Sequence, residues 1–568
     1  MKKLTFGTPE KYVPSLFCQD FRYEEKSIKY PVDKISFREN ARGCVLELPV
    51  EKEEHFFGLG LQLKGFDLTG RKYILRVNSD PIAETGDSHA PVPFFVSSKG
   101  YGIFIDTARY AEINFGKIYV KGAKQQLKTR EIATSTEELY TLSELTDGSV
   151  ITVQIPAAKG VDVYIMEGET VTDVVSQYNM LSGGGCNPPE WGLGTIYRCC
   201  TRYSQDRVLS TARYFKENRL PVSVIGLEPG WQTKTYSCSY VWNNELYPEP
   251  KEMVESLYAD GYHVNLWEHV FTHPSSPIYK ELLSYCGNYE VWNGLVPDFS
   301  FAEAKEIFAR YHRENVTFGL IDGFKLDECD DSDYQRNWSF PLCSEFPSGM
   351  DGEQYHSLIG TLYMQTMLSV SGDTLSSVRN AGALGASYPF VLYSDLYDHR
   401  DFVRGLATAG FSGILWTPEL RHAGSREELL RRLQTVVFSP QCLINAWYCE
   451  ELPWLNYDCE DEVRELLCER VKLIPRLKKA FENYKKKGIP PVRAVVSDYT
   501  SDAETYGIDD EYLLGDDLLV APIISGESRR SVYLPQGEWS DYWTGKPVQC
   551  GRFDVETEKI PVYVKNGR

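Results

Sequence analysis

Four apolar runs in the middle of the chain lead directly into side chains that could do acid–base chemistry. These runs are Val224–Glu228, Val264–His269, Gly323–Asp330 and Pro389–Asp395. If they are strands of one barrel, their carboxyl ends meet at one mouth, where barrel enzymes carry their reacting groups. Carboxylates that converge there suit cleavage of a glycosidic bond. One acid can protonate the leaving oxygen, and one carboxylate can meet the oxocarbenium-like carbon.

Each of these groups also has a simpler interpretation when it is taken singly. An Asp that follows a strand can cap a helix or carry a loop charge. The acidic run Asp327–Asp333 could be a solvated loop or a calcium loop, although it lacks the Gly and the distal Glu of the EF-hand pattern. His269 could be a core histidine. Since the chain has no His or Cys pairs at metal-ligand spacing, no metal site is expected.

The elements that would position these groups alternate between strand and helix from residue 186 to 488. Strands are predicted at 221–227, 262–267, 323–326 and 389–393, and helices at 252–260, 302–312, 355–370 and 426–437. This alternation predicts a central (β/α)8 TIM barrel. Residues 1–185 show short alternating runs and frequent turns, which predicts an N-terminal antiparallel β-sandwich. Residues 489–568 predict a small C-terminal β-sandwich, so the fold class is multidomain.

Composition excludes several classes of function. The 568 residues carry a net charge of −20, which disfavours nucleic-acid and membrane-surface partners because both are anionic. No apolar stretch is long enough for a secretory signal or a membrane span. The 14 cysteines are scattered, with no CxxC pair, so reduced thiols and a cytoplasmic location are expected.

Five further segments give the chain a resemblance to glycoside hydrolase family 31 that runs nearly from end to end. Phe56–Gly60 resembles the N-terminal signature of that family, and Ile225–Trp231 and Pro297–Ser300 resemble segments of its barrel. Leu513–Pro522 and Tyr533–Trp539 are similar to the family's β-sandwich after the barrel. Members of the family are mostly α-glucosidases and α-xylosidases.

The resemblance implies roles for the two carboxylates. Lys325-Leu-Asp327-Glu-Cys-Asp330 matches the nucleophile motif, in the variant with Lys two residues before the Asp that α-xylosidases use. Asp327 is therefore the expected nucleophile. Arg379-Asn-Ala-Gly382 matches the motif that precedes the acid/base, and Asp395, 16 residues after Arg379, is the expected acid/base. We expect Asp395 to be buried, more so than its neighbour Asp398, which would cap a helix or reach a sugar hydroxyl.

Other residues are expected to bind the sugar. They are Glu228, Trp231, Trp267, Lys325, Asp330, Arg379, Asp398, Glu419 and Asn445. Three positions depart from the family pattern: Glu228 replaces an Asp, Asn445 replaces a sugar-binding His, and Leu392 replaces a Trp. Because hydrogen-bonded sites discriminate strongly, these changes leave α-glucoside, α-xyloside and α-galactoside open as substrates.

The resemblance implies a retaining, exo-acting α-glycoside hydrolase that releases one non-reducing-end sugar without a cofactor. The expected partner is an oligosaccharide or glycoside substrate, and a homo-oligomer is possible. Two alternatives remain open: a non-catalytic carbohydrate-binding barrel, and an α-glucan lyase or transglycosylase that shares the glycosyl-enzyme step.

Overall fold

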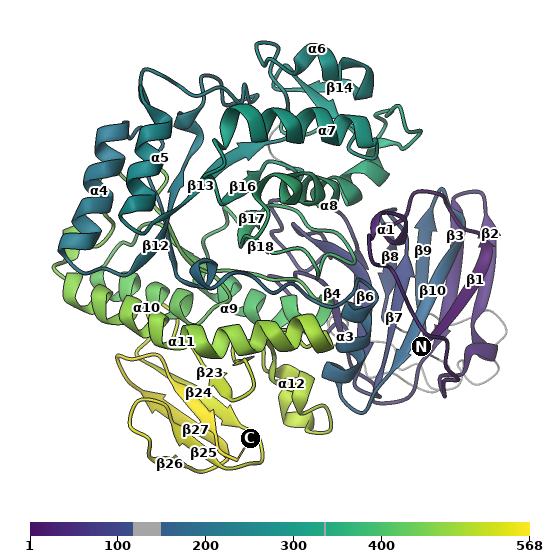
Figure 1. The fold of residues 1–568 in the computed structure, drawn as a ribbon. Coiled ribbons are helices and arrows are strands. Elements are labelled where there is room, and N and C mark those ends of the chain that lie inside the picture. The colour runs from purple at the N-terminus through teal and green to yellow at the C-terminus, as the bar shows by residue number, and fades with distance from the viewer. Residues whose placement is uncertain (117–148, 334–336, 568) are drawn as a thin grey trace, which may run out of the picture.

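The computed structural model describes residues 1–116, 149–333 and 337–567. The chain forms three parts (Figure 1). A purple strand-rich part at the N-terminus lies beside a teal and green barrel, and a yellow strand-rich part at the C-terminus lies below the barrel helices. The predicted fold class, a β-sandwich, a TIM barrel and a small β-domain, is confirmed.

The N-terminal part is a sandwich of two five-stranded antiparallel sheets, in the orders β1-β10-β7-β6-β4 and β2-β3-β9-β8-β5. Its strands are β1 (Lys2–Thr8), β2 (Ser36–Asn40), β3 (Gly43–Pro49), β4 (Phe56–Gly60), β5 (Lys72–Ile74), β6 (Pro91–Ser97), β7 (Tyr101–Asp106), β8 (Glu112–Asn114), β9 (Val150–Pro156) and β10 (Lys159–Glu167). Apolar side chains between the sheets, among them Leu46, Ile103 and Val153, are fully buried. Burying one face of each sheet in this way provides the main driving force for the sandwich.

The central part is a closed barrel of eight parallel strands. They are β11 (Thr195–Arg198), β12 (Val222–Leu227), β13 (His263–His269), β16 (Gly323–Asp327), β17 (Ser376–Val378), β18 (Phe390–Leu392), β19 (Glu419–Leu420) and β20 (Cys442–Asn445). The strands follow one another in this order around the sheet. The bridge between Leu392 and Trp416, just before β19, joins the two ends of the sheet. A β14–β15 hairpin (Cys286–Val291 and Gly294–Pro297) projects from the loop after β13.

Helices surround the barrel, and side-chain caps set where several of them begin. The helices are α4 (Gln205–Glu217), α5 (Pro250–Ala259), α6 (Tyr279–Leu282), α7 (Ala302–Tyr311), α8 (Gly352–Ser371), α9 (His399–Thr408), α10 (Arg426–Val437) and α11 (Glu460–Lys487). The side chains of Ser204, Asp351 and Ser425 accept hydrogen bonds from first-turn amides of α4, α8 and α10, satisfying donors that a helix start leaves free. Short helices α1 (Pro14–Phe17), α3 (Val171–Met180) and α12 (Val495–Asp498) lie outside the barrel. None of the helices in the described ranges is long and apolar enough to cross a membrane.

The C-terminal part combines a six-stranded sheet with a two-stranded one. The strands are β21 (Val492–Ala494), β22 (Tyr512–Leu514), β23 (Leu518–Val520), β24 (Arg529–Leu534), β25 (Trp539–Asp541), β26 (Pro547–Val548), β27 (Gly551–Glu556) and β28 (Val562–Lys565). Strands β24 and β27 form the small sheet. Buried Leu519, Val532 and Trp539 belong to the core of this part.

Arg470, in the middle of α11, joins this long helix to the barrel. Its side chain is fully buried, and it donates hydrogen bonds to the carbonyls of Leu193, Val437, Ser439 and Pro440 at 2.6–3.0 Å. Burial lowers the pKa of Arg470 to about 10. The guanidinium therefore satisfies four carbonyls in two separate segments of the chain, Leu193 and residues 437–440.

Replacing this donor should destabilise the barrel. In Arg470→Met the stem length is kept but four carbonyls lose their partner, so the free energy of unfolding should fall by at least about 3 kcal/mol. Denaturant unfolding measures the change. The control Arg476→Met, on the same helix with a side chain 41% exposed, should lose less than about 1 kcal/mol. Equal small losses in both variants would contradict the role given to Arg470.

Candidate active site

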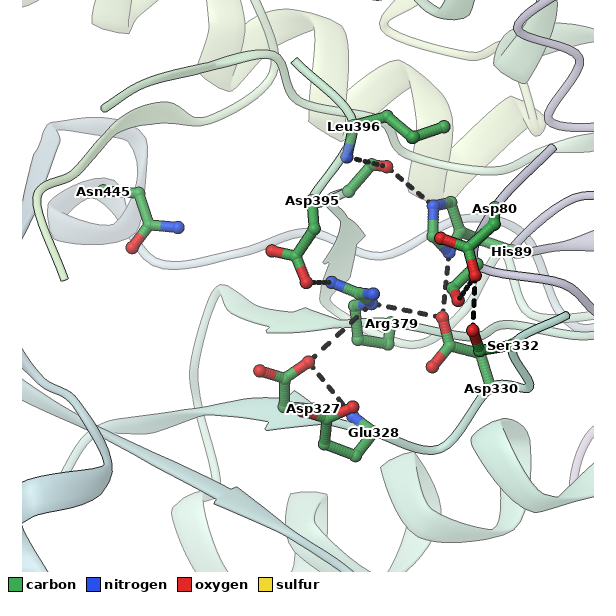
Figure 2. A network of polar contacts seen from close by, with 12 residues as sticks. Asp80, His89, Asp327, Glu328, Asp330, Ser332, Arg379, Asp395, Leu396 and Asn445 are labelled. Carbon is green, nitrogen blue, oxygen red and sulfur yellow. Dashed lines mark hydrogen bonds and ion pairs between the residues drawn. The ribbon is translucent and has the colours of Figure 1, made fainter. Parts of the chain in front are cut away.

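The guanidinium of Arg379 is the centre of a network of acids at the mouth of the barrel (Figure 2). Arg379 follows β17 and is 1% exposed. Its nitrogens lie 2.6 Å from Asp395, 3.1 Å from Asp330 and 3.7 Å from Asp327. The charges of these acids outweigh desolvation and raise the pKa of Arg379 well above its ordinary value. One buried cation thus holds three carboxylates together.

Asp327, the last residue of β16, is buried in this network. The indole N–H of Trp267 donates to its Oδ2 at 2.6 Å, and the backbone N–H of Glu328 donates to its Oδ1 at 3.0 Å. The Lys325 ammonium lies 4.0 Å from Oδ2. Donors on both oxygens fix the orientation of the carboxylate, as a nucleophile requires.

Asp395 reaches the same guanidinium from the loop after β18. Its side chain is 50% exposed, and Arg421 lies 3.6 Å from its Oδ1. Desolvation raises the pKa of Asp395, but Arg379 and Arg421 outweigh it and hold the pKa well below its ordinary value. We expected a buried acid. That expectation is wrong, because charged partners rather than apolar packing hold this side chain.

Asp398 is a helix cap. Its side chain accepts a hydrogen bond from the backbone N–H of Asp401 at 2.9 Å, in the first turn of α9. The prediction that Asp398 caps backbone amides is confirmed. Both Asp395 and Asp398 are exposed, so burial does not separate the two as we had expected.

A buried ion triad lies at the ends of β11, β12 and β16. Glu228 accepts a hydrogen bond from Arg198 Nε and lies 3.1 Å from Lys325 Nζ. Burial raises the pKa of Glu228, but the two cations outweigh it and lower the pKa below its ordinary value. Arg198 also donates to Asn265 at 2.6 Å. Sequence reasoning missed Arg198, although a cation that ends an apolar strand of a barrel could have been recognised.

A second polar chain connects β19 with β20. Asn445 Nδ2 donates to Glu419 at 2.8 Å, and Arg421 donates to the other oxygen of Glu419. The Asn445 Oδ1 atom is buried and has no hydrogen-bond partner. Arg421 also donates hydrogen bonds to the backbone carbonyls of Ser394 and Asp395, at 2.6 and 3.0 Å. The predicted residues Glu419 and Asn445 are therefore linked to the Asp395 loop.

The two predicted tryptophans differ in position. Trp267 bonds directly to Asp327, whereas the fully buried Trp231 donates its indole N–H to the carbonyl of Trp267 at 2.6 Å. Trp231 packs against Trp242 with ring centroids 5.0 Å apart. The structure thus places Trp231 behind Trp267, in the core, and a contact of Trp231 with sugar stays a prediction.

Three residues near Asp327 were not anticipated. Glu328 is buried, and desolvation and the Asp327 charge raise its pKa well above the ordinary value. It accepts a hydrogen bond from the hydroxyl of Tyr236, whose side chain is half exposed. His89, from the N-terminal sandwich, bonds to Asp330 at 3.0 Å. In the described ranges no three His, Cys, Asp or Glu side chains are arranged to hold a metal ion.

Three separate parts of the chain match models of one protein family. Residues 186–480 match the family model described as "Glycosyl hydrolases family 31 TIM-barrel domain". Residues 488–568 match the "Glycosyl hydrolase family 31 C-terminal domain". Residues 16–114 match the "Glycosyl hydrolase 31 N-terminal galactose mutarotase-like domain".

Several individual proteins are similar to this chain at low sequence identity. An alpha-xylosidase of Emericella nidulans is 22% identical, over 94% of this chain and 68% of its own length. An isomaltosyltransferase of Sporosarcina globispora is 24% identical over 90% of this chain, which spans about half (51%) of that protein. The structure of a Flavobacterium johnsoniae dextranase in complex with glucose superposes with a TM-score of 0.80, at 22% identity, over 94% of this chain and 68% of that one.

The ion triad yields a prediction about stability. Glu228→Gln leaves Arg198 and Lys325 buried without their carboxylate, so the free energy of unfolding at pH 7 should fall by about 3–5 kcal/mol. Because the pKa of Glu228 is lowered in the folded protein, the triad stabilises above the ordinary pKa and loses its contribution as pH falls through the folded-state pKa.

The difference between wild type and Glu228→Gln should therefore narrow between pH 5 and pH 3, as measured by urea unfolding. Glu217→Gln, at an exposed position on α4, is the control and should change the free energy by no more than about 0.5 kcal/mol. A difference that widens in acid would show that Glu228 is not held ionised by its neighbours.

Proposed function

Because the chain belongs to glycoside hydrolase family 31 and is thus a glycoside hydrolase, we propose that it is a retaining, exo-acting α-glycosidase that releases one non-reducing-end sugar. The observation that carries this proposal is that the single guanidinium of Arg379 contacts both Asp327 and Asp395. Retention requires two carboxyl groups about 5–5.5 Å apart, on either side of one bond. The shared guanidinium brings the two acids to one place, which supports the proposal of a retaining mechanism.

Asp327 acts as the nucleophile in this proposal. It attacks the anomeric carbon and forms a glycosyl-enzyme, while the bond to the leaving oxygen breaks. The Trp267 N–H on Oδ2 and the Glu328 N–H on Oδ1 hold the carboxylate in place before the sugar arrives. Preorganisation of this kind lowers the barrier because the group need not be reoriented during the reaction.

Asp395 acts as the acid and then as the base. In the free protein Arg379 and Arg421 favour the ionised form of Asp395. Asp395 therefore has to take up a proton from solvent when the substrate binds. A sugar that covers the half-exposed carboxyl removes water from it, and desolvation raises a carboxyl pKa. The proton then passes to the leaving oxygen, and the same carboxylate later takes a proton from the attacking water.

The charges of the site favour a neutral sugar. Each of its four cations already has an acidic partner: Arg198 and Lys325 contact Glu228, Arg379 contacts Asp330, and Arg421 contacts Glu419. A sulfonate or carboxylate on the sugar would have to displace one of these acids, which leaves a buried charge unpaired. Neutral α-glucosides, α-xylosides and α-galactosides remain the proposed substrates.

The interior of the barrel is filled with side chains. Ile196, Val224, Tyr393 and Leu443 form a buried cluster inside it, as expected for a packed barrel interior. Because barrels of this type are generally packed in this way, the exo mode of action stays a proposal that product analysis tests. A screen of nitrophenyl α-glycosides would identify the sugar, and product analysis would separate hydrolysis from the transglycosylase and lyase alternatives.

Variants of the two acids test the mechanism. Asp327→Ala should fold normally and lose turnover on every substrate, because no glycosyl-enzyme can form. Asp395→Ala should lose activity most on poor leaving groups and be partly rescued by azide, which needs no general base. Kinetics on activated and unactivated glycosides measure both effects. Normal turnover in Asp327→Ala would rule out this nucleophile and favour a non-catalytic, carbohydrate-binding barrel.

Arg421 should set one limb of the pH profile. Since its charge helps to hold the pKa of Asp395 down, Arg421→Gln should raise that pKa and move the basic limb of kcat, which reports the enzyme–substrate complex, to higher pH. Arg421→Lys keeps the charge and should move the limb less. An unchanged limb in Arg421→Gln would mean that a group other than Asp395 supplies the proton.

A further inference from the structure

His89 reaches the barrel from the sandwich, in the segment between β5 and β6. Other contacts hold this segment against the loop after β16. The backbone N–H of Ser79 donates to the carbonyl of Asp331 at 2.7 Å, and Asn78 Nδ2 donates to Asp333 at 3.1 Å. His89 itself is fully buried. Its position is thus fixed by contacts between two parts of the chain that fold as separate sheets.

Both nitrogens of His89 contact residues next to the expected catalytic acids (Figure 2). Nδ1 lies 3.0 Å from Asp330, which also accepts from Arg379 at 3.1 Å. Nε2 lies 2.7 Å from the hydroxyl of Ser394, the residue before Asp395. The imidazole therefore connects the loop after β16 with the loop after β18.

Hydrogen-bond accounting defines how the imidazole is protonated. Burial raises the pKa of Asp330, but the Arg379 charge and the His89 contact outweigh it and lower the pKa. An ionised Asp330 can only accept, so Nδ1 donates to it. The Ser394 hydroxyl already accepts from the backbone N–H of Leu396 at 3.0 Å. The Nδ1 proton of His89 is therefore directed at Asp330, and Nε2 shares its hydrogen bond with the Ser394 hydroxyl.

We propose that His89 is a positioning residue that sets the acid/base Asp395 relative to the nucleophile Asp327. Through Ser394 it holds the start of the loop that carries Asp395, whose side chain is half exposed. Through Asp330 it holds the guanidinium that both acids share. The proposal rests on the proposed function, because it takes Asp395 to be the proton donor.

Two substitutions of His89 test the contacts of its two nitrogens separately. In His89→Asn the amide nitrogen lies where Nδ1 was, so the bond to Asp330 is kept and the bond to Ser394 is lost. In His89→Gln the amide lies where Nε2 was, so the bond to Ser394 is kept instead. Ser394→Ala removes the same contact as His89→Asn from the other side.

The readout is the dependence of kcat/KM on the leaving group. A misplaced acid slows poor leaving groups, which need a proton, more than activated ones. His89→Asn and Ser394→Ala should therefore lower kcat/KM for an alkyl glycoside about tenfold or more beyond their effect on the nitrophenyl glycoside. The double variant should be no worse than either single one, because both remove one contact. His89→Gln should lower kcat/KM for the two substrates by the same factor.

His55→Asn is the matched control, because His55 pairs with Asp67 at 2.6 Å within the sandwich. This variant should leave the dependence of kcat/KM on the leaving group unchanged. If His89→Asn lowered kcat/KM equally for both substrates, His89 would have only a structural role and the proposal would be overturned. Asp395→Ala is measured in parallel. If it shows leaving-group dependence and His89→Asn does not, only the His89 inference fails; if Asp395→Ala shows none, the proposed function fails.

Discussion

The site depends on one buried cation. Arg379 is 1% exposed and lies among Asp327, Asp330 and Asp395. Carboxylates this close repel one another, and taking them out of water is unfavourable unless a cation compensates. The guanidinium makes the convergence of three acids possible, and its fixed, planar geometry sets their directions. The position of Arg379 at the end of β17, beside β16 and β18, follows from the order of strands in the barrel.

The same principle recurs in the neighbouring groups of the barrel mouth. Glu228 is compensated by Arg198 and Lys325, and Glu419 by Arg421. The charged groups are held in pairs before any sugar binds, so they offer directed donors and acceptors rather than free charge. Such a site discriminates by hydrogen bonding, because an ill-matched sugar leaves buried polar groups unpaired.

Sequence reasoning succeeded where a property was local. Apolar runs such as Val222–Leu227 and the capped helix at Arg426–Val437 carry their own periodicity and end signals. Asp327 was recognisable because the motif that contains it lies at the end of an apolar strand. The long helix Glu460–Lys487, although amphipathic, was not predicted. His89 lies 241 residues from Asp330 and 305 from Ser394, and no local pattern encodes such a contact. The exposure of Asp395 was misjudged for the same reason, since its partners Arg379 and Arg421 come from other strands.

The central claim is that Asp327, held beside Asp395 by Arg379, forms a covalent bond to the sugar. Trapping with a 5-fluoro-glycosyl fluoride of the sugar found in the substrate screen, followed by peptide mass mapping, tests it most directly. We expect one sugar adduct per protein molecule, located on Asp327 by fragmentation of the labelled peptide, and none in Asp327→Ala. An adduct on Asp395 or Glu328 would contradict it.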